Sequence, residues 1–247
     1  MNWGERVLSR WNEAMFRGRS QVWGKLSLRP GLPVPQNDAR TRNEQEFYRK
    51  VLTRAFPVQP QAGIERVWDI GCRNWSYARS LCSFFPKSEV IGVELDGGRR
   101  YWNFYRRADL AESHAAELRS SGYDAKFVWS DFLKLAPRAF SEKPSLFCFF
   151  FPFVSSDPCL GWGLPAFYSD FQAMLSHTRR FDADARIVSC HQGEWEAEIA
   201  RTLYAVHGER GIFREEILFP EDFSGLWPSH HPVHIFSSIL PSDSSLA

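Results

Sequence analysis

The chain has 247 residues, of which 30 are Lys or Arg and 29 are Asp or Glu, so its formal net charge is +1. This length suffices for one large α/β domain with a sizeable core. The near-neutral charge gives no general argument for nucleic acid or an anionic membrane as a partner. The five Cys are odd in number and form no CxxC pair. They argue against a disulfide framework and a zinc ribbon, and they favour a reducing cytoplasm.

The apolar runs of the chain are short. The longest, Leu146 to Val154, contains Pro152 and has about half the length that a bilayer span requires. No secretory signal is evident, because the first residues lack an apolar segment and carry Glu5 and Glu13. We therefore expect a cytoplasmic protein with no membrane partner.

The chain divides into two regions that differ in their predicted secondary structure. Residues 1–62 predict an N-terminal helical extension, and residues 63–247 predict the main domain. Within the extension, the Pro-containing segment 29–43 indicates a loop or linker, and a second helix is expected at 44–56.

The first 20 residues predict an amphipathic helix. Trp3, Val7 and Trp11 recur at helical spacing, and Asn2 with Glu5 resembles a capping box. We expect this helix to pack on the main domain; a lid or an arm that contacts the substrate is the alternative.

The main domain alternates between predicted strands and helices, which is typical of a doubly wound parallel sheet. The expected strands are residues 64–70, 90–94, 126–129, 146–151 and 186–190, followed by an antiparallel pair at 213–219 and 233–240. The expected helices run through 77–84, 98–120, 166–180 and 194–206, with a loop at 155–166.

The main domain is organised around the stretch that passes from its first strand into its first helix. Gly71 permits a tight turn directly after the strand, and Asn74 or Ser76 can cap the following helix. Ligands of open α/β sheets bind in the crevice at the carboxyl ends of the strands. This stretch therefore predicts a site for a nucleotide-like ligand.

Three carboxylates mark the ends of the first three strands. Asp69 lies two residues before Gly71, Glu94 ends the second strand, and Asp131 follows the third. An acid at the end of the second strand accepts hydrogen bonds from ribose hydroxyls in this type of fold. The G-x-G-x-x-G pattern of dinucleotide sites is absent, because Arg73 and Ser76 occupy its later glycine positions.

The order VWDIGCRNW, VIGVELD, WSDF and FFFPF, followed by a closing pair of antiparallel strands, resembles the class I S-adenosylmethionine-dependent methyltransferases. The resemblance covers about residues 63–240. It implies a Rossmann-like seven-stranded sheet with the last strand antiparallel and helices on both faces. It also implies S-adenosylmethionine as the cofactor.

The resemblance implies a role for each strand end. Asp69 and Gly71 would lie beside the amino-acid part of the cofactor, Glu94 would bind the ribose, and Asp131 would bind the adenine amino group. The other residues that it assigns to the cofactor are Leu95 near the adenosine, Phe132 on the adenine ring, and Phe151 and Pro152 bordering the region of methyl transfer.

This chain departs from the family pattern D-x-G-x-G-x-G at two positions, where Arg73 and Trp75 replace glycines. Either the loop stands farther from the cofactor, or these two side chains contact it themselves. Arg73 could pair with the cofactor carboxylate, whereas Trp75 could lie against the cofactor or fill the core.

The acceptor side offers candidates after the fourth and fifth strands. We select Asp157 and His191 as catalytic candidates, because His191 has the intrinsic pKa of a general base. A His191 that is hydrogen-bonded to loop backbone is the structural alternative. Further candidates are Ser155, Ser156, Trp162, Gln192 and Glu194.

A cluster of arginines and a cluster of histidines are not expected to form functional sites. Arg99, Arg100, Arg106 and Arg107 are expected on one face of the helix at 98–120, paired with nearby acids; a nucleic-acid patch is the alternative. No metal site is expected from the histidines at 230, 231 and 234, because the prolines at 228 and 232 disfavour a helix there.

The sequence thus predicts an S-adenosylmethionine-dependent methyltransferase with an unidentified acceptor, a small molecule rather than nucleic acid. The alternatives are a non-catalytic binding or interaction module with an occluded cofactor loop, and an RNA methyltransferase. The oligomeric state is left open.

Overall fold

The structure is a computed structural model that describes residues 2–19, 31–35, 37–57, 63–136, 143–207, 212–226 and 230–239. The predictions made for residues 1, 20, 29–30, 36, 228 and 240 lie outside this described part of the chain.

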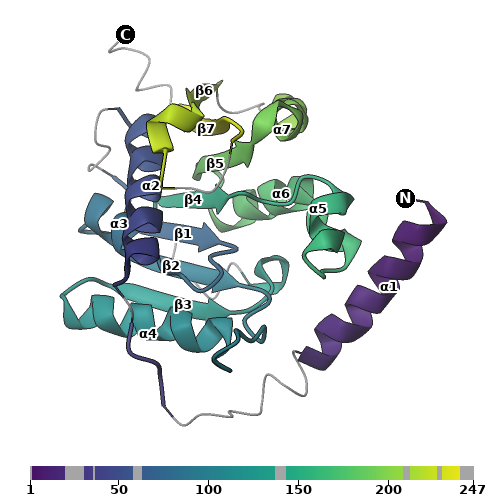
Figure 1. Cartoon of the computed structure of the whole chain (residues 1–247). Coiled ribbons are helices and arrows are strands. Elements are labelled where there is room, and N and C mark those ends of the chain that lie inside the picture. Colours follow the sequence, from purple (N-terminus) through teal and green to yellow (C-terminus); the bar gives the residue numbers. More distant parts are fainter. Residues whose placement is uncertain are drawn as a thin grey trace.

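Among the described residues, seven strands form one sheet in the order β3-β2-β1-β4-β5-β7-β6 (Figure 1). Strands β1 to β5 are parallel, and β7 runs antiparallel to its neighbours β5 and β6. The predicted doubly wound sheet with an antiparallel last strand is confirmed. The strands are β1 Arg66–Ile70, β2 Glu89–Glu94, β3 Ala125–Trp129, β4 Ser145–Phe150, β5 Arg186–Gln192, β6 Ile212–Leu218 and β7 Val233–Ile239.

Helices cover both faces of the sheet (Figure 1). One face carries α2 Ala39–Ala55, α3 Ala78–Phe84 and α4 Arg107–Ser120, and the other carries α6 Phe171–Phe181 and α7 Gly193–His207. The remaining helical elements are α1 Trp3–Gly18, α5 Ser156–Gly161 and the 3₁₀ turns η2 Phe132–Lys134, η4 Ala166–Ser169 and η6 Pro220–Phe223.

Strand β4 illustrates why the sheet is buried on both faces. Its side chains alternate, so that Leu146, Cys148 and Phe150 join the core beneath α2 and α3, whereas Phe147 and Phe149 join the core beneath α6. A run of apolar residues without polar alternation is the pattern of a strand in a doubly covered parallel sheet.

Helix α2 belongs to the sheet core although it lies within residues 1–62. Phe47, Tyr48 and Leu52 are buried against the face that carries α3. The helix also begins earlier than the expected residue 44, because Asp38 caps it by accepting a 2.7 Å hydrogen bond from the Thr41 amide.

The long helix predicted at 98–120 is wrong in its first part. Helix α4 begins at Arg107, and the preceding residues form a loop that closes through a bridge between Arg100 and Arg106. The glycine pair 97–98 and the aromatic-rich segment 101–105 favour helix poorly. The four arginines at 99, 100, 106 and 107 therefore do not share a helix face.

Two local predictions near the ligand edge are also wrong. Residues 156–161 of the expected loop form the short helix α5. Neither Asn74 nor Ser76 caps α3; the N-cap residue is Tyr77, without a side-chain capping bond, and the Ser76 hydroxyl donates to the Glu44 carboxylate instead.

Helix α1 packs on the main domain as expected. Its capping box between Asn2 and Glu5 is confirmed. The Asn12 side chain donates 3.0 Å hydrogen bonds to the carbonyls of Leu160 and Leu164, and the Phe16 ring lies 5.4 Å from the Tyr168 ring. None of the described helices is long and apolar enough to cross a bilayer.

Candidate functional site

A cavity of about 320 Å³ opens at the carboxyl ends of the parallel strands; we call it the carboxyl-edge cavity. Its walls come from the ends of β1, β2, β4 and β5, from the residues after β3, from α2 and from the α5–η4 region. Of the residues assigned to the cofactor from the sequence, it brings together Gly71, Arg73, Glu94, Leu95, Asp131, Phe132, Phe151 and Pro152.

The loop after β1 keeps a glycine-like backbone although two of its glycines are replaced. Gly71, Arg73 and Trp75 have φ angles of 81°, 57° and 57°. These are the three glycine positions of the family pattern, and the left-handed region costs an ordinary residue about 1 kcal/mol or more. The loop therefore retains the turn of a glycine loop at some cost in backbone strain.

Trp75 explains what stabilises this loop. Its ring is fully buried in the core, and its Nε1 atom donates a 2.8 Å hydrogen bond to the Asp69 carboxylate. The ring also covers Gly92 of β2, where an added Cβ would lie 2.7 Å from the indole. Trp75 thus fills the space below the loop, outside the carboxyl-edge cavity.

Asp69 lies in the same buried layer. Its second oxygen accepts a 3.3 Å hydrogen bond from the Tyr77 hydroxyl, and Tyr77 itself lines the cavity. Burial raises the pKa of Asp69 to about 7, against the lowering effect of the bonds from Tyr77 and Trp75. The structure therefore places Asp69 behind the cavity wall, where it holds two side chains of the first loop.

Glu94 joins the first and second loops. One oxygen accepts a 2.8 Å hydrogen bond from the Arg73 amide and the other a 2.7 Å bond from the Asp96 amide. The Arg107 guanidinium lies 3.5 Å from the second oxygen. A carboxylate oxygen has two lone pairs. The oxygen that accepts from the Arg73 amide therefore keeps acceptor capacity, whereas the other accepts from both Asp96 and Arg107.

Arg73 brings a cation to the cavity wall. Among the described residues, its buried Nε atom has no hydrogen-bond partner. The same side chain lines a neighbouring cavity of about 340 Å³, between the start of α2 and the loop before α4. A buried donor without a partner is costly, so this guanidinium is suited to an anionic ligand group.

Asp131 and Phe132 form the adjoining part of the wall. One Asp131 oxygen accepts a 3.0 Å hydrogen bond from the Leu133 amide and caps the turn η2. Phe132 is buried and packs against Phe149, with ring centroids 6.2 Å apart. This part of the cavity thus combines a fixed carboxylate with a rigid apolar surface.

On the side of β4 and β5, the wall is aromatic with two polar groups. Phe151 has a left-handed φ of 56°, and its backbone amide donates a 3.0 Å hydrogen bond to the backbone carbonyl of Cys190. The Glu196 carboxylate lines the cavity and accepts a 2.8 Å bond from the Gln192 amide. Burial raises the pKa of Glu196.

Tyr48, Arg107 and Glu196 also line the cavity, although they were not predicted from the sequence as cavity residues. Glu196 was detectable in principle, because α7 begins immediately after β5 and its first turn faces back toward the strand end. Tyr48 and Arg107 reach the cavity only through the packing of α2 and α4, which carries no local sequence signal.

The two catalytic candidates lie away from this cavity. Strand β5 continues through Gln192, so His191 is a buried strand residue whose Nε2 atom lies 2.8 Å from the Ser189 hydroxyl. Burial, together with His234, lowers the pKa of His191 to about 3. Asp157 is exposed in the first turn of α5, whereas its neighbour Pro158 lines the cavity.

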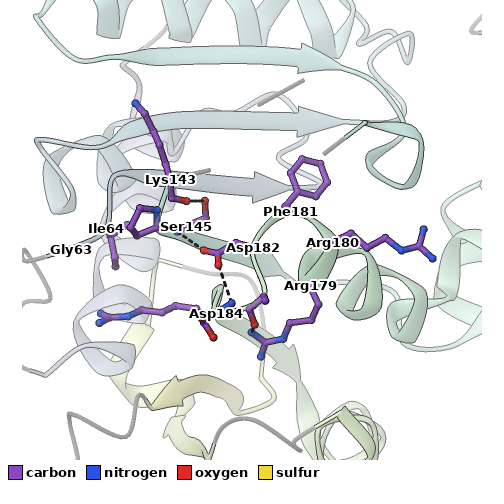
Figure 2. Close-up of a pocket in the computed structure, with 12 residues that line it drawn as sticks. Gly63, Ile64, Lys143, Ser145, Arg179, Arg180, Phe181, Asp182 and Asp184 are labelled. Carbon is purple, nitrogen blue, oxygen red and sulfur yellow. Dashed lines mark hydrogen bonds between the residues drawn. The ribbon is translucent and has the colours of Figure 1, made fainter. Parts of the chain in front are cut away.

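A larger cavity, of about 620 Å³, lies at the opposite, amino-terminal edge of the sheet (Figure 2). Its carboxylate Asp182 accepts backbone hydrogen bonds of 3.0 and 2.9 Å from Ser145 and Asp184. Arg179 donates to the carbonyls of residues 183 and 185. These charged groups are used to hold the local backbone, at the edge where doubly wound sheets do not bind ligands.

Metal ligands do not converge in the described part of the chain. No group of three or more His, Cys, Asp or Glu side chains there has the arrangement of a metal site. His234, one of the three histidines considered in the sequence, instead lies 2.8 Å from the Glu215 carboxylate.

No protein-family model and no curated protein matches the chain. Solved structures do match. A S-adenosylmethionine-dependent methyltransferase from Aquifex aeolicus aligns with a TM-score of 0.51 at 11% identity, over 83% of this chain and 95% of that one. Magnesium protoporphyrin IX methyltransferase from Synechocystis PCC 6803, solved with the cofactor bound, aligns with a TM-score of 0.50 at 13% identity, over 97% and 98%. The chain has the Rossmann-like fold of the class I methyltransferases.

Proposed function

We propose that the chain binds S-adenosylmethionine in the carboxyl-edge cavity and transfers its methyl group to a small-molecule acceptor. The observation that carries the proposal is the convergence of Glu94, Asp131 and the Arg73 guanidinium on one cavity. These groups complement ribose hydroxyls, an amino group and a carboxylate, which are the polar parts of that cofactor.

Each of these three residues matches one polar part of the cofactor in its hydrogen-bonding and charge. Glu94 is fixed by two backbone amides and keeps acceptor capacity for ribose hydroxyls. Asp131 is fixed by its turn, and Leu95 and Phe132 offer an apolar surface beside it for the adenine ring. The Arg73 guanidinium supplies the positive charge that complements a carboxylate, and its Nε atom has no hydrogen-bond partner in the described part of the chain.

When bound, the cofactor supplies an electrophilic methyl group on a sulfonium sulfur. The chain then has to hold an acceptor in line with that group, exclude water and remove a proton. Phe151, Pro152 and Phe153 form an apolar wall on the side of β4. Glu196 is the lining carboxylate that has no assigned role toward the cofactor, and its pKa, raised by burial, suits it to accept a proton.

The walls also favour a small acceptor. The acceptor side consists mostly of aromatic side chains, and its polar groups, Gln192 and Glu196, are few. Such a concave apolar lining with sparse polar groups is typical of sites for small molecules. The hypothesis of an occluded cofactor loop has little support, because Trp75 is buried beneath the loop.

Calorimetry with S-adenosylhomocysteine tests the cofactor proposal. We expect saturable binding to the purified chain and its loss in Glu94→Ala, with an unchanged far-UV spectrum. A wild-type chain that is folded and free of endogenous ligand but releases no heat of binding would refute the proposal.

The acceptor class requires a separate experiment. We expect label from S-adenosylmethionine carrying a radioactive methyl group to enter the small-molecule fraction of a cell extract in the presence of the chain. Glu94→Ala serves as the control for background transfer. Label confined to RNA would overturn the small-molecule acceptor while leaving methyl transfer intact.

A further inference from the structure

Helix α1 has three distinct faces. One docks on the main domain through Ser9, Asn12 and Phe16: Asn12 donates to two backbone carbonyls, and the Ser9 hydroxyl accepts a 3.0 Å bond from the Ala166 amide. The docked face occupies only part of the helix circumference. The other two faces are therefore open to the surroundings.

The second face is apolar and exposed. Its two indoles, Trp3 and Trp11, are 81% and 64% exposed, and Val7, Leu8 and Met15 are exposed as well. On a helical projection these side chains fall on one continuous side. Contiguous exposed apolar side chains that include two indoles are typical of an interaction surface. Figure 1 shows α1 at the edge of the molecule, away from the sheet.

The third face is basic and borders the apolar one. It carries Arg6, Arg10 and Arg17, with Glu13 paired to Arg17. Within the described part of the chain, Arg6 and Arg10 have no ion pair. A helix with exposed Trp and Leu on one side and arginines beside them has the composition of an interfacial membrane helix.

We propose that α1 binds an anionic phospholipid surface, with Trp3, Val7 and Trp11 inserted among the acyl chains and Arg6 and Arg10 at the headgroups. Tryptophan suits this position because it is apolar with one polar edge. A second copy of this chain fits less well. It would bring more arginines to the contact, and the one acid on the exposed faces, Glu13, is already paired.

This placement is compatible with the docked structure. The membrane-facing and docked sides lie on different parts of the helix, so binding requires no release of Asn12 or Phe16. Phe16 packs on Tyr168, which lines the carboxyl-edge cavity. A surface-bound α1 would therefore hold the cavity close to the bilayer.

Vesicle flotation with the full chain tests the proposal. We expect wild type to float with vesicles of phosphatidylcholine and phosphatidylglycerol, to bind pure phosphatidylcholine more weakly, and to dissociate partly at high salt. The double variant Trp3→Ser, Trp11→Ser should lose at least about tenfold in partitioning. Arg6→Gln with Arg10→Gln should lose the preference for phosphatidylglycerol.

Trp102→Ser provides the matched control, because Trp102 is 91% exposed on the loop before α4. It should bind vesicles like wild type, which shows that the indoles of α1 are specifically required. Wild type that stays unbound, or a double variant that binds equally, would overturn the proposal. So would self-association of wild type, abolished in the double variant, without any vesicle binding.

Discussion

The indole Nε1 of Trp75 donates a 2.8 Å hydrogen bond to Asp69, six residues earlier in the chain. This bond ties the first loop to the end of the strand that precedes it. It also places a donor on a carboxylate that is fully buried. The protonation of Asp69 is therefore linked to the stability of the candidate site.

Asp69→Asn should change how stability depends on pH. Burial raises the pKa of Asp69 from 3.8 to about 7, so the folded state keeps a proton that the unfolded chain releases. As pH rises between these two values, wild type should lose stability relative to the variant by about 1.4 kcal/mol per pH unit. Asparagine keeps an acceptor for Trp75 and offers Tyr77 a donor.

The measurement is urea unfolding of both proteins between about pH 4 and pH 8, a range that runs from close to the lower pKa of Asp69 to about one pH unit above the upper one. His191 acts in the opposite sense, since its pKa is lowered to about 3 and stability falls as pH drops below its ordinary value. The difference between variant and wild type cancels that contribution. A constant difference at all pH values would contradict a raised pKa of Asp69.

Arg73→Met should distinguish the contribution of the cofactor carboxylate to binding affinity from that of the adenosine part. If the guanidinium holds the carboxylate, S-adenosylhomocysteine should bind about ten- to a hundredfold more weakly, the range for a charged hydrogen bond. Adenosine lacks that carboxylate, so its affinity should not change. Calorimetry with both ligands checks this, and Arg79→Met, at an exposed pair with Glu117, is the control. Equal losses for both ligands would indicate a general disturbance of the loop.

Asp131→Asn should weaken both ligands. The asparagine side chain retains an oxygen that accepts from the Leu133 backbone amide. Its NH2 group then replaces the second carboxylate oxygen, so it meets the adenine amino group with a donor where an acceptor is needed. We expect a loss of about tenfold for adenosine and S-adenosylhomocysteine alike. Asp124→Asn, at an exposed carboxylate near the start of β3, should bind both ligands like wild type. Unchanged affinity in Asp131→Asn would exclude Asp131 from the adenine site.

Gly92→Ala should destabilise the fold through its contact with Trp75. The added Cβ would lie 2.7 Å from the indole, and overpacking of this kind costs about 1–3 kcal/mol. Urea unfolding measures the loss. Gly18→Ala, where an added Cβ meets no atom within 4 Å, should change stability little. A neutral Gly92→Ala would mean that the Trp75 ring can move aside.

The sequence predicted the strands well because buried parallel strands leave continuous apolar runs, as in β4 and β5. It also located Glu94 and Asp131, since Glu94 ends such a run and Asp131 lies two residues after the edge strand β3. Errors arose where tertiary packing decides. His191 lies within β5 because β7 pairs with it there through His234, and the sequence gives no sign of how far that pairing extends.

The first loop shows the same limit. The sequence shows that Arg73 and Trp75 replace glycines, but it does not show that their side chains point in different directions. Arg73 turns to the cavity and Trp75 to the core, although both have the same left-handed φ of 57°. The Trp75 side chain turns to the core because Gly92, on the neighbouring strand β2, has no side chain and leaves room for the indole.

Gly92 and Trp75 form a pair of complementary size, one absent side chain and one very large one. In homologous proteins these two positions should therefore vary together: a glycine at position 75 would relieve position 92 of its need to be glycine. A search for distant homologues that tolerates this exchange, and does not demand an intact glycine loop, should recover sequences that the usual pattern overlooks.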